Sequence, residues 1–185
     1  MSHKVCPWWL GYFLASPLRR LVHNPATILR PFVTEGMIVF EPGPGMGYFT
    51  LELARLVGLQ GRVVAVDLQP QMLLELRRRA EKAGLLDRID ARQGPGDGMG
   101  LDDLKGQVDF VLAFGVVHEL PNIERFFAEA SKVLKPGCRL LLAEPHIQVS
   151  EQEFAVTLQI AKRSGFHLNS QPAIRCARSA VLVKV

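Results

Sequence analysis

Cysteine is scarce in this chain of 185 residues: Cys6, Cys138 and Cys176 lie far apart, and no C-x-x-C pair occurs. An odd and scattered set argues against a disulfide framework and a structural zinc site, so a reducing cytoplasm is the default expectation. Long apolar runs are also missing, since the stretch 8–15 is far shorter than the ~20 residues that span a bilayer. No small-residue cleavage site follows that stretch, and we therefore expect neither a signal peptide nor a membrane span.

A strong excess of one charge is missing as well. The net charge is +4 and the pI is about 9.2, which permits an anionic partner but does not require one. A hydrophobic content of 48% with 22% charged residues is typical of a globular protein, and the length suits about one domain. Nucleic acid is therefore not indicated as a partner.

Glycine, in contrast, is concentrated in one informative stretch. An apolar run ends at Glu41 and is followed by glycines at alternate positions, Gly43, Gly45 and Gly47. This order predicts a buried strand, a tight turn and a helix that opens at Tyr48. Glycines leave the backbone accessible to a ligand, and the first N–H groups of the helix are free to bind one. In parallel α/β sheets, ligands bind beyond the carboxyl ends of the strands, where this turn would lie.

Two common phosphate-binding motifs do not fit this turn. The dinucleotide fingerprint G-x-G-x-x-G needs its third glycine at position 48, which is tyrosine, and no Gly-Lys-Ser/Thr follows as a phosphate loop requires. A nicotinamide-dependent oxidoreductase is therefore disfavoured. Asp67, however, ends the next apolar run, and a carboxylate about 20 residues beyond the first glycines can accept hydrogen bonds from a ribose diol.

Apolar periodicity predicts alternating strands and helices along the chain. Strands are expected at 37–40, 62–67, 88–92, 108–117 and 139–143, helices at 48–57, 70–83, 121–134 and 151–164, and a closing hairpin from 166–170 and 180–185. Ser150 and Glu153 form a capping box before the last helix. The alternation predicts a doubly wound, mostly parallel α/β sheet, and the closing strand pair predicts one antiparallel strand.

The first 33 residues are distinct from the domain expected at 34–185. Ser16-Pro17 predicts a helix at 18–23, and prolines bracket another at 26–30. Three interpretations remain open: a helical packing element over one sheet edge, a lid whose aromatic side chains wall an acceptor pocket, or an anchor on a membrane surface. The aromatic residues in question are Trp8, Trp9, Tyr12 and Phe13.

The glycine loop together with Asp67 resembles motif I and the following acidic position of the class I S-adenosylmethionine-dependent methyltransferases. The stretch Leu134-Lys135-Pro136-Gly137-Cys138-Arg139-Leu140 is similar to the Leu-Lys-Pro-Gly-Gly-x-Leu segment of that family, and 114–121 is similar to the fourth-strand exit of its small-molecule members. The resemblance covers about 34–185. It implies a Rossmann-like sheet of seven strands whose last strand is antiparallel.

The resemblance also implies S-adenosylmethionine as the cofactor, S-adenosylhomocysteine as the product, and a set of binding residues. The family usually has an acid where Pro95 stands, so Asp97 or the backbone would have to hold the adenine amino group. For Glu41 and Asp67, helix capping or loop bracing is the structural alternative to cofactor binding. The implied contacts are Glu41 with the methionine amino group, the backbone at Gly43, Gly45 and Gly47 with the methionine and ribose, Asp67 with the ribose hydroxyls, Leu68 with the adenine face, Gly94 and Pro95 with the adenine edge, and the main chain of Phe114 with the methionine end.

A sulfonium is an activated methyl donor, so the protein mainly has to align the acceptor and exclude water. A base is needed only where the acceptor must lose a proton. His118 at the fourth-strand exit is the first candidate for a catalytic base and His146 at the fifth-strand exit is the second, with a structural hydrogen-bonding role as the alternative for His118. We assign His3, His23 and His167 to the surface or to packing.

A small, partly apolar methyl acceptor is favoured by the aromatic N-terminal segment. The Asn/Asp-Pro-Pro-Tyr motif of amino-methylating nucleic-acid enzymes is missing at the fourth-strand exit, and no carboxylate cluster suggests a metal site of the catechol type. An RNA or protein methyltransferase, or a non-catalytic S-adenosylmethionine-binding module, are the alternatives that the sequence leaves open.

Overall fold

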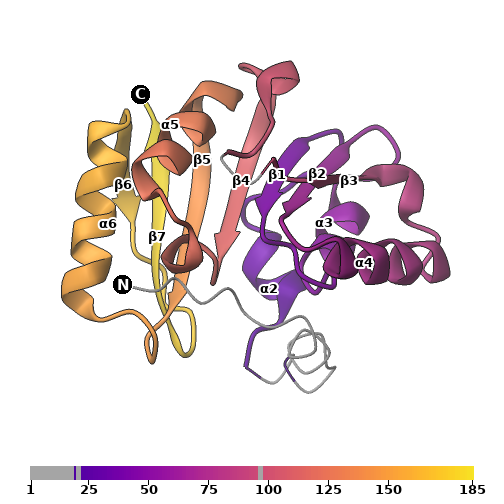
Figure 1. The fold of residues 1–185 in the computed structure, drawn as a ribbon, viewed down its shortest axis with the longest axis horizontal. Coiled ribbons are helices and arrows are strands. Elements are labelled where there is room, and N and C mark those ends of the chain that lie inside the picture. The colour runs from indigo at the N-terminus through magenta and orange to yellow at the C-terminus, as the bar shows by residue number, and fades with distance from the viewer. Residues whose placement is uncertain (1–18, 20–21, 96–97) are drawn as a thin grey trace.

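A seven-stranded sheet forms the middle of the molecule, and helices cover both of its faces (Figure 1). The computed structural model describes residue 19, residues 22–95 and residues 98–185. The predictions that fall on 1–18 and on Asp97 lie outside the described residues. The strands are β1 Ile38–Pro42, β2 Arg62–Asp67, β3 Ile89–Gln93, β4 Val108–Phe114, β5 Leu134–Pro145, β6 Phe166–Ser170 and β7 Ala177–Lys184, and the helices are α2 Pro25–Leu29, α3 Thr50–Leu56, α4 Pro70–Lys82, α5 Ile123–Val133 and α6 Glu151–Arg163.

The strand order is β3-β2-β1-β4-β5-β7-β6. Pairing is parallel from β3 to β5, whereas β7 runs antiparallel to both β5 and β6. The predicted doubly wound sheet with one antiparallel strand is therefore confirmed. Because the chain leaves β1 toward β2 and later returns to pair β4 with the other side of β1, the sheet has its topological switch point between β1 and β4. Such a point is where α/β sheets bind ligands.

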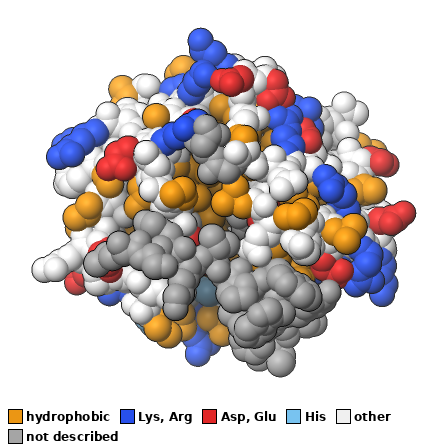
Figure 2. Space-filling model, in the orientation of Figure 1, with side chains coloured by type: hydrophobic (Ala, Val, Ile, Leu, Met, Phe, Trp, Pro, Cys, Tyr) orange, Lys and Arg blue, Asp and Glu red, His pale blue; other side chains and the backbone are white. Residues whose placement is uncertain are grey.

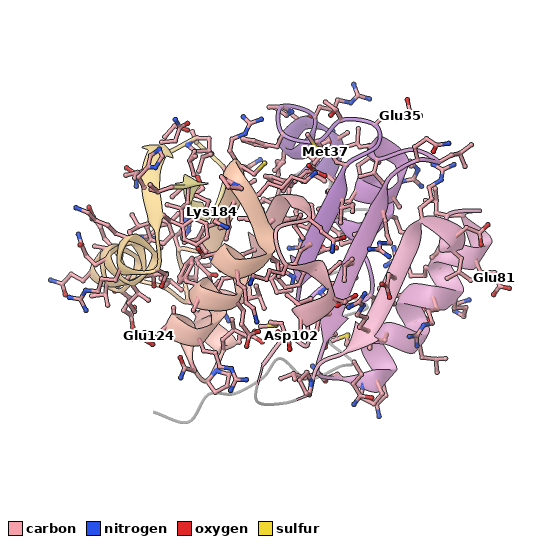
Figure 3. All side chains as sticks on the ribbon, turned by 90° about the horizontal axis from the view of Figure 1, so that it is seen from above. Glu35, Met37, Glu81, Asp102, Glu124 and Lys184 are labelled. Carbon is pink, nitrogen blue, oxygen red and sulfur yellow. The ribbon has the colours of Figure 1, made fainter. Side chains whose placement is uncertain are left out.

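Alternate residues of the central strands pack against different helices, as the two-residue repeat of a strand requires. Val39 belongs to the cluster with residues of α2, α3 and α4, whereas the adjacent Phe40 belongs to the cluster with residues of α5 and α6. The outer faces of the helices are polar, and Figure 3 shows Glu81 of α4 and Glu124 of α5 at the periphery of the molecule. In the described part of the chain no helix is long and apolar enough to cross a membrane.

Local capping accounts for where several helices begin. The side chain of Asn24 accepts N–H bonds at the start of α2, and Asn122 does the same for α5. The predicted capping box of Ser150 and Glu153 is confirmed at the start of α6. The short helix expected at 26–30 is confirmed as α2.

Several predicted boundaries are wrong by a few residues. Strand β4 ends at Phe114 rather than at 117, because Gly115 with φ +67° turns the chain into a 3-10 turn at Val117–Glu119. The helix after the glycine loop opens at Thr50, since the residues before it form turns. The remaining corrections are α5, which starts at Ile123 and ends at Val133, β5, which extends from Leu134 to Pro145, and β7, which starts at Ala177.

Candidate cofactor and acceptor site

A cavity of about 1000 Å³ opens beyond the carboxyl ends of β1, β2 and β4, at the topological switch point. Figure 1 shows these strands ending on the lower side of the sheet, and Figure 2 shows hydrophobic side chains gathered near the middle of the same view. Gly47 and Pro95, which the sequence analysis also placed at the cofactor, do not line the cavity. The predicted binding residues that do line it are Glu41, Gly43, Gly45, Asp67, Leu68, Gly94 and Phe114.

The glycine loop is held from two sides and open on a third. All three glycines have positive φ, at +60° for Gly43, +54° for Gly45 and +81° for Gly47. A Cβ on Gly43 would lie 2.5 Å from the Val116 side chain, and one on Gly47 would lie 2.3 Å from the Leu76 side chain of α4. A Cβ on Gly45 would meet nothing within 4 Å. Gly45 therefore leaves its backbone accessible from the cavity, as the sequence predicted for this loop.

Asp67 braces this loop from the end of β2. Its carboxylate accepts the Gly45 N–H at 3.1 Å and the Gln69 N–H at 2.9 Å. Burial raises the pKa of Asp67, and these backbone N–H groups lower it in part. The bracing role, which the sequence analysis held as an alternative, is thus present in the structure. Each carboxylate oxygen can accept more than one hydrogen bond, so bracing leaves Asp67 able to bind a ligand.

Glu41 ends β1 as a buried acid with an unsatisfied oxygen. Its residue exposure is only 4%, and Oε2 has no hydrogen-bond partner among the residues that the structure describes. Burial raises the pKa of Glu41 to about 8, the Thr50 hydroxyl lowers it, Asp67 raises it and Arg19 lowers it. A buried polar atom without a partner is costly. A cationic donor in the cavity would supply the missing interaction.

An arginine from the N-terminal segment completes this end of the cavity. The guanidinium of Arg19 lies 4.6 Å from the ring centroid of Tyr48, 5.5 Å from that of Phe49 and 5.9 Å from that of Phe114, all within cation–π range. Burial lowers the pKa of Arg19, while Tyr48 and Glu41 raise it. Arg19 lines the cavity. No local motif marks it in the sequence, because its position depends on how the segment packs against α3 and β4.

His23 also lines the cavity, whereas the sequence analysis assigned it to the surface or to packing. Its Nε2 lies 2.7 Å from the Arg175 carbonyl oxygen, and its ring meets that of Phe114 edge-on at 5.0 Å. The Tyr48 hydroxyl donates to the His23 carbonyl oxygen at 2.6 Å. Residues from the first 33 thus belong to the wall of the site.

Neither histidine predicted as a catalytic base lines the cavity. His146 is exposed, and its backbone N–H donates to the Cys176 carbonyl oxygen at 3.3 Å. His118 is partly buried, and its Nδ1 pairs with the carboxylate of Glu144, a buried residue of β5 that the sequence analysis missed. The other oxygen of Glu144 accepts the Val117 N–H at 2.9 Å.

The other ring nitrogen of His118 lies behind a residue of the cavity wall. Nε2 is buried, has no hydrogen-bond partner in the described parts of the chain, and lies 3.8 Å from Oε1 of Glu119. Glu119 lines the cavity. Burial lowers the pKa of His118, but Glu144 and Glu119 raise it more, so that it lies above the ordinary value. Within the described ranges, no group of three or more His, Cys, Asp or Glu residues could hold a metal ion.

Comparison with known proteins assigns the chain to a family. A family profile described as a methyltransferase domain matches residues 40–142. A ubiquinone/menaquinone biosynthesis C-methyltransferase UbiE from Brucella anthropi is 28% identical over 139 residues, which are 75% of this chain and 51% of that protein. The UbiE protein of Brucella suis biovar 1 is 29% identical over 116 residues, 63% of this chain and 42% of that protein. The chain therefore spans about half the length of the curated relatives that it matches.

Solved structures share the whole fold. A SAM-dependent methyltransferase from Aquifex aeolicus superposes with a TM-score of 0.83 at 24% identity, covering 97% of this chain and 98% of that one. A putative methyltransferase from Haloferax volcanii, solved with the Trm112 methyltransferase activator, superposes with a TM-score of 0.77 at 16% identity, covering 98% and 99%. At these identities the likeness shows the fold. The chain belongs to the methyltransferase domain family and has the fold of the class I S-adenosylmethionine-dependent methyltransferases.

Proposed function

We propose that this chain transfers a methyl group from S-adenosylmethionine to a small, partly apolar acceptor. The observation that carries the proposal is the convergence of an open glycine backbone, the buried Glu41 and the partly buried Asp67 on one cavity at the switch point of the sheet. An isolated glycine loop would be weak support. The two acids make this loop suited to a ligand that has both a cationic group and a ribose diol.

The residues present fit that cofactor. The unsatisfied Oε2 of Glu41 would accept from the ammonium group of the methionine part, and Asp67 would accept from the ribose hydroxyls. Leu68, of which 40% is exposed, would cover the adenine together with Gly94. The main chain of Phe114 would border the methionine end, as the family resemblance implies.

When bound, S-adenosylmethionine supplies a methyl group activated on a sulfonium. The part of this chain is to bind, orient and exclude water, which are the main requirements of an in-line displacement. The rings of Tyr48, Phe49 and Phe114 pack together on one side of the cavity and make that side apolar. A volume of about 1000 Å³ lies at the upper end of the ~300–1,000 Å³ typical of ligand pockets, so the cofactor leaves space for a second small molecule.

The names of the curated relatives support a small-molecule acceptor, because they denote C-methyltransferases of ubiquinone and menaquinone biosynthesis. The cavity wall agrees with this, since the apolar side chains of Leu120, Phe126 and Ile147 also line it. We therefore favour an acceptor with an aromatic or otherwise apolar body. This choice also fits the modest net charge of +4, which argues against a long polyanion.

Methyl-labelled S-adenosylmethionine tests the proposal. The full chain is incubated with the labelled cofactor and with three separate acceptor pools: hydroquinones and phenols, a small-RNA preparation, and a protein extract. We expect label to appear in the organic-solvent extract of the small-molecule pool, and the Asp67→Ala variant to reduce that transfer. Label only in RNA or only in protein would contradict the acceptor class, and failure to bind the cofactor would contradict the proposal as a whole.

A further inference from the structure

The 3-10 turn after β4 brings three ionisable side chains into a row that ends at the cavity. Glu144 on β5 is 1% exposed and contacts Nδ1 of His118. Nε2 of His118 lies 3.8 Å from Oε1 of Glu119, and Glu119 lines the cavity. His118 and Glu119 follow β4, whereas Glu144 lies near the end of β5, 26 and 25 positions further along the chain. Only the fold brings the three side chains together.

The pairing with Glu144 decides the state of the imidazole. A buried carboxylate next to Nδ1 accepts a hydrogen bond from it, so the neutral ring carries its proton on Nδ1 and its lone pair on Nε2. Nε2 is the buried ring atom that has no hydrogen-bond partner among the described residues. When a second proton arrives on Nε2, the carboxylates on both sides of the ring stabilise the resulting imidazolium.

We propose that Glu119 and His118, oriented by Glu144, form a proton relay that accepts a proton from the cavity, and that the acceptor is therefore a molecule whose attacking atom must lose a proton, such as a phenol, a thiol or a carbon acid. This inference rests on the proposed function and specifies its acceptor. Glu119 is the catalytic residue of the relay, since it faces the cavity, and His118 and Glu144 are positioning and proton-holding residues behind it.

The proton and the electrons balance in one displacement. The X–H bond of the acceptor breaks and its proton moves to the Glu119 carboxylate, while the remaining electron pair on X forms the bond to the methyl carbon. The electron pair of the carbon–sulfur bond stays on sulfur. A rotation of the Glu119 side chain that closes the 3.8 Å gap then lets Nε2 of His118 take the proton, and the proton returns through Glu119 to water in the cavity after the methylated product has left.

The cavity wall also carries the charged side chains of Arg125 and Glu129 of α5, which pair with each other at 2.9 Å. Glu144 and Glu119 are the charged groups that act on His118 within the described structure. A change at Glu119 should therefore be felt directly by His118, and a change at Glu124 on the outer side of α5 should not (Figure 3).

The first arm of the test measures His118 itself. The full chain is saturated with S-adenosylhomocysteine, and the tautomer and the pKa of each imidazole are followed by nitrogen-edited NMR, with His118→Asn identifying the resonance. We expect the Nδ1-protonated tautomer, and we expect Glu119→Gln to lower the pKa of His118 by about one unit. Glu124→Gln removes the same charge from an exposed site and should leave the pKa of His118 unchanged. An Nε2-protonated tautomer, or an unchanged pKa in Glu119→Gln, would overturn the relay.

The second arm measures turnover with defined acceptors. The panel holds three acceptors that must lose a proton, a phenol, an aryl thiol and a 1,3-diketone, and two that need not, pyridine and a dialkyl thioether. We expect turnover of at least one of the first three acceptors. The Glu119→Gln variant should turn it over about 100-fold more slowly while binding S-adenosylhomocysteine with unchanged affinity. The wild-type rate should decrease as the pH drops below the pKa of His118. No turnover of these three by protein that binds the product, or equal rates in both proteins, would overturn the relay. Failure of the wild-type protein to bind S-adenosylhomocysteine would instead refute the proposed function.

Discussion

Replacing Glu41 by glutamine should stabilise the ligand-free protein at alkaline pH. Burial raises the pKa of Glu41 from 4.5 to about 8, so the folded state keeps this carboxyl neutral while the unfolded chain ionises it. The sign follows directly. The contribution of Glu41 to the free energy of unfolding is present below about pH 4.5 and is lost as pH rises toward 8, because the unfolded state releases a proton that the folded state retains.

The magnitude follows from the same shift. A difference of 8 − 4.5 = 3.5 pKa units corresponds to about 5 kcal/mol at 1.36 kcal/mol per unit. About half of that loss is reached near pH 6, and a glutamine, which has no charge to desolvate, avoids all of it. For a chain of this length, 1 kcal/mol shifts the melting temperature by about 2–4 °C. The Glu41→Gln variant should therefore melt about 10–20 °C above the wild-type protein at pH 8–9 and close to it at pH 4–5.

Thermal unfolding followed by circular dichroism from pH 4 to pH 9 measures this difference. Glu81→Gln is the matched control, because Glu81 is exposed at the periphery of α4 (Figure 3) and its substitution removes the same charge. The Glu41→Gln variant should also bind S-adenosylhomocysteine more weakly, since the neutral amide replaces an acceptor for a cation. Parallel melting curves across the pH range, or a Glu41→Gln variant that is less stable at pH 8, would refute the reasoning that burial keeps this carboxyl protonated in the folded state.

Three further substitutions test other parts of the site. Asp67→Ala removes the acceptor of the Gly45 N–H and of the ribose hydroxyls, so calorimetry should show binding of S-adenosylhomocysteine weakened by about 2 kcal/mol, roughly 30-fold, whereas unchanged affinity would remove Asp67 from the site. Gly43→Ala would place a Cβ 2.5 Å from Val116 at φ +60°, and it should lower the free energy of unfolding by about 1–3 kcal/mol; a wild-type denaturation midpoint would show that the loop is not held there. Asn122→Ala removes the cap of α5 and should lower the free energy of unfolding by about 1 kcal/mol, which denaturant unfolding checks; an unchanged denaturation midpoint would show that the cap contributes nothing.

The glycine loop and the acids beside it could be predicted from the sequence because their signal is local. The positive φ of Gly43, Gly45 and Gly47 restricts those positions to glycine, and the apolar runs that end at Glu41 and Asp67 mark the strands that place them. The parallel sheet then brings both strand ends to the same edge. Sequence periodicity also predicted the helices on both faces, apart from their exact ends, which depend on single caps and turns.

The acceptor side could not be predicted in the same way. Whether His118 or Glu119 faces the cavity depends on the 3-10 turn that follows Gly115, and the near-continuous apolar run through Val116 and Val117 predicted a continuing strand instead. The partner Glu144 lies 26 residues further along the chain. Arg19 enters the wall through tertiary packing against three aromatic rings, for which no motif exists.

Calorimetric titration of the full chain with S-adenosylhomocysteine, with NAD run in parallel, tests the central claim most directly. We expect micromolar binding of S-adenosylhomocysteine and none of NAD, because the loop lacks the third glycine of the dinucleotide fingerprint, whereas Glu41 and Asp67 beside it suit a cationic methionine group and a ribose. Binding of NAD alone, or of neither compound, would contradict the assignment of this cavity to S-adenosylmethionine.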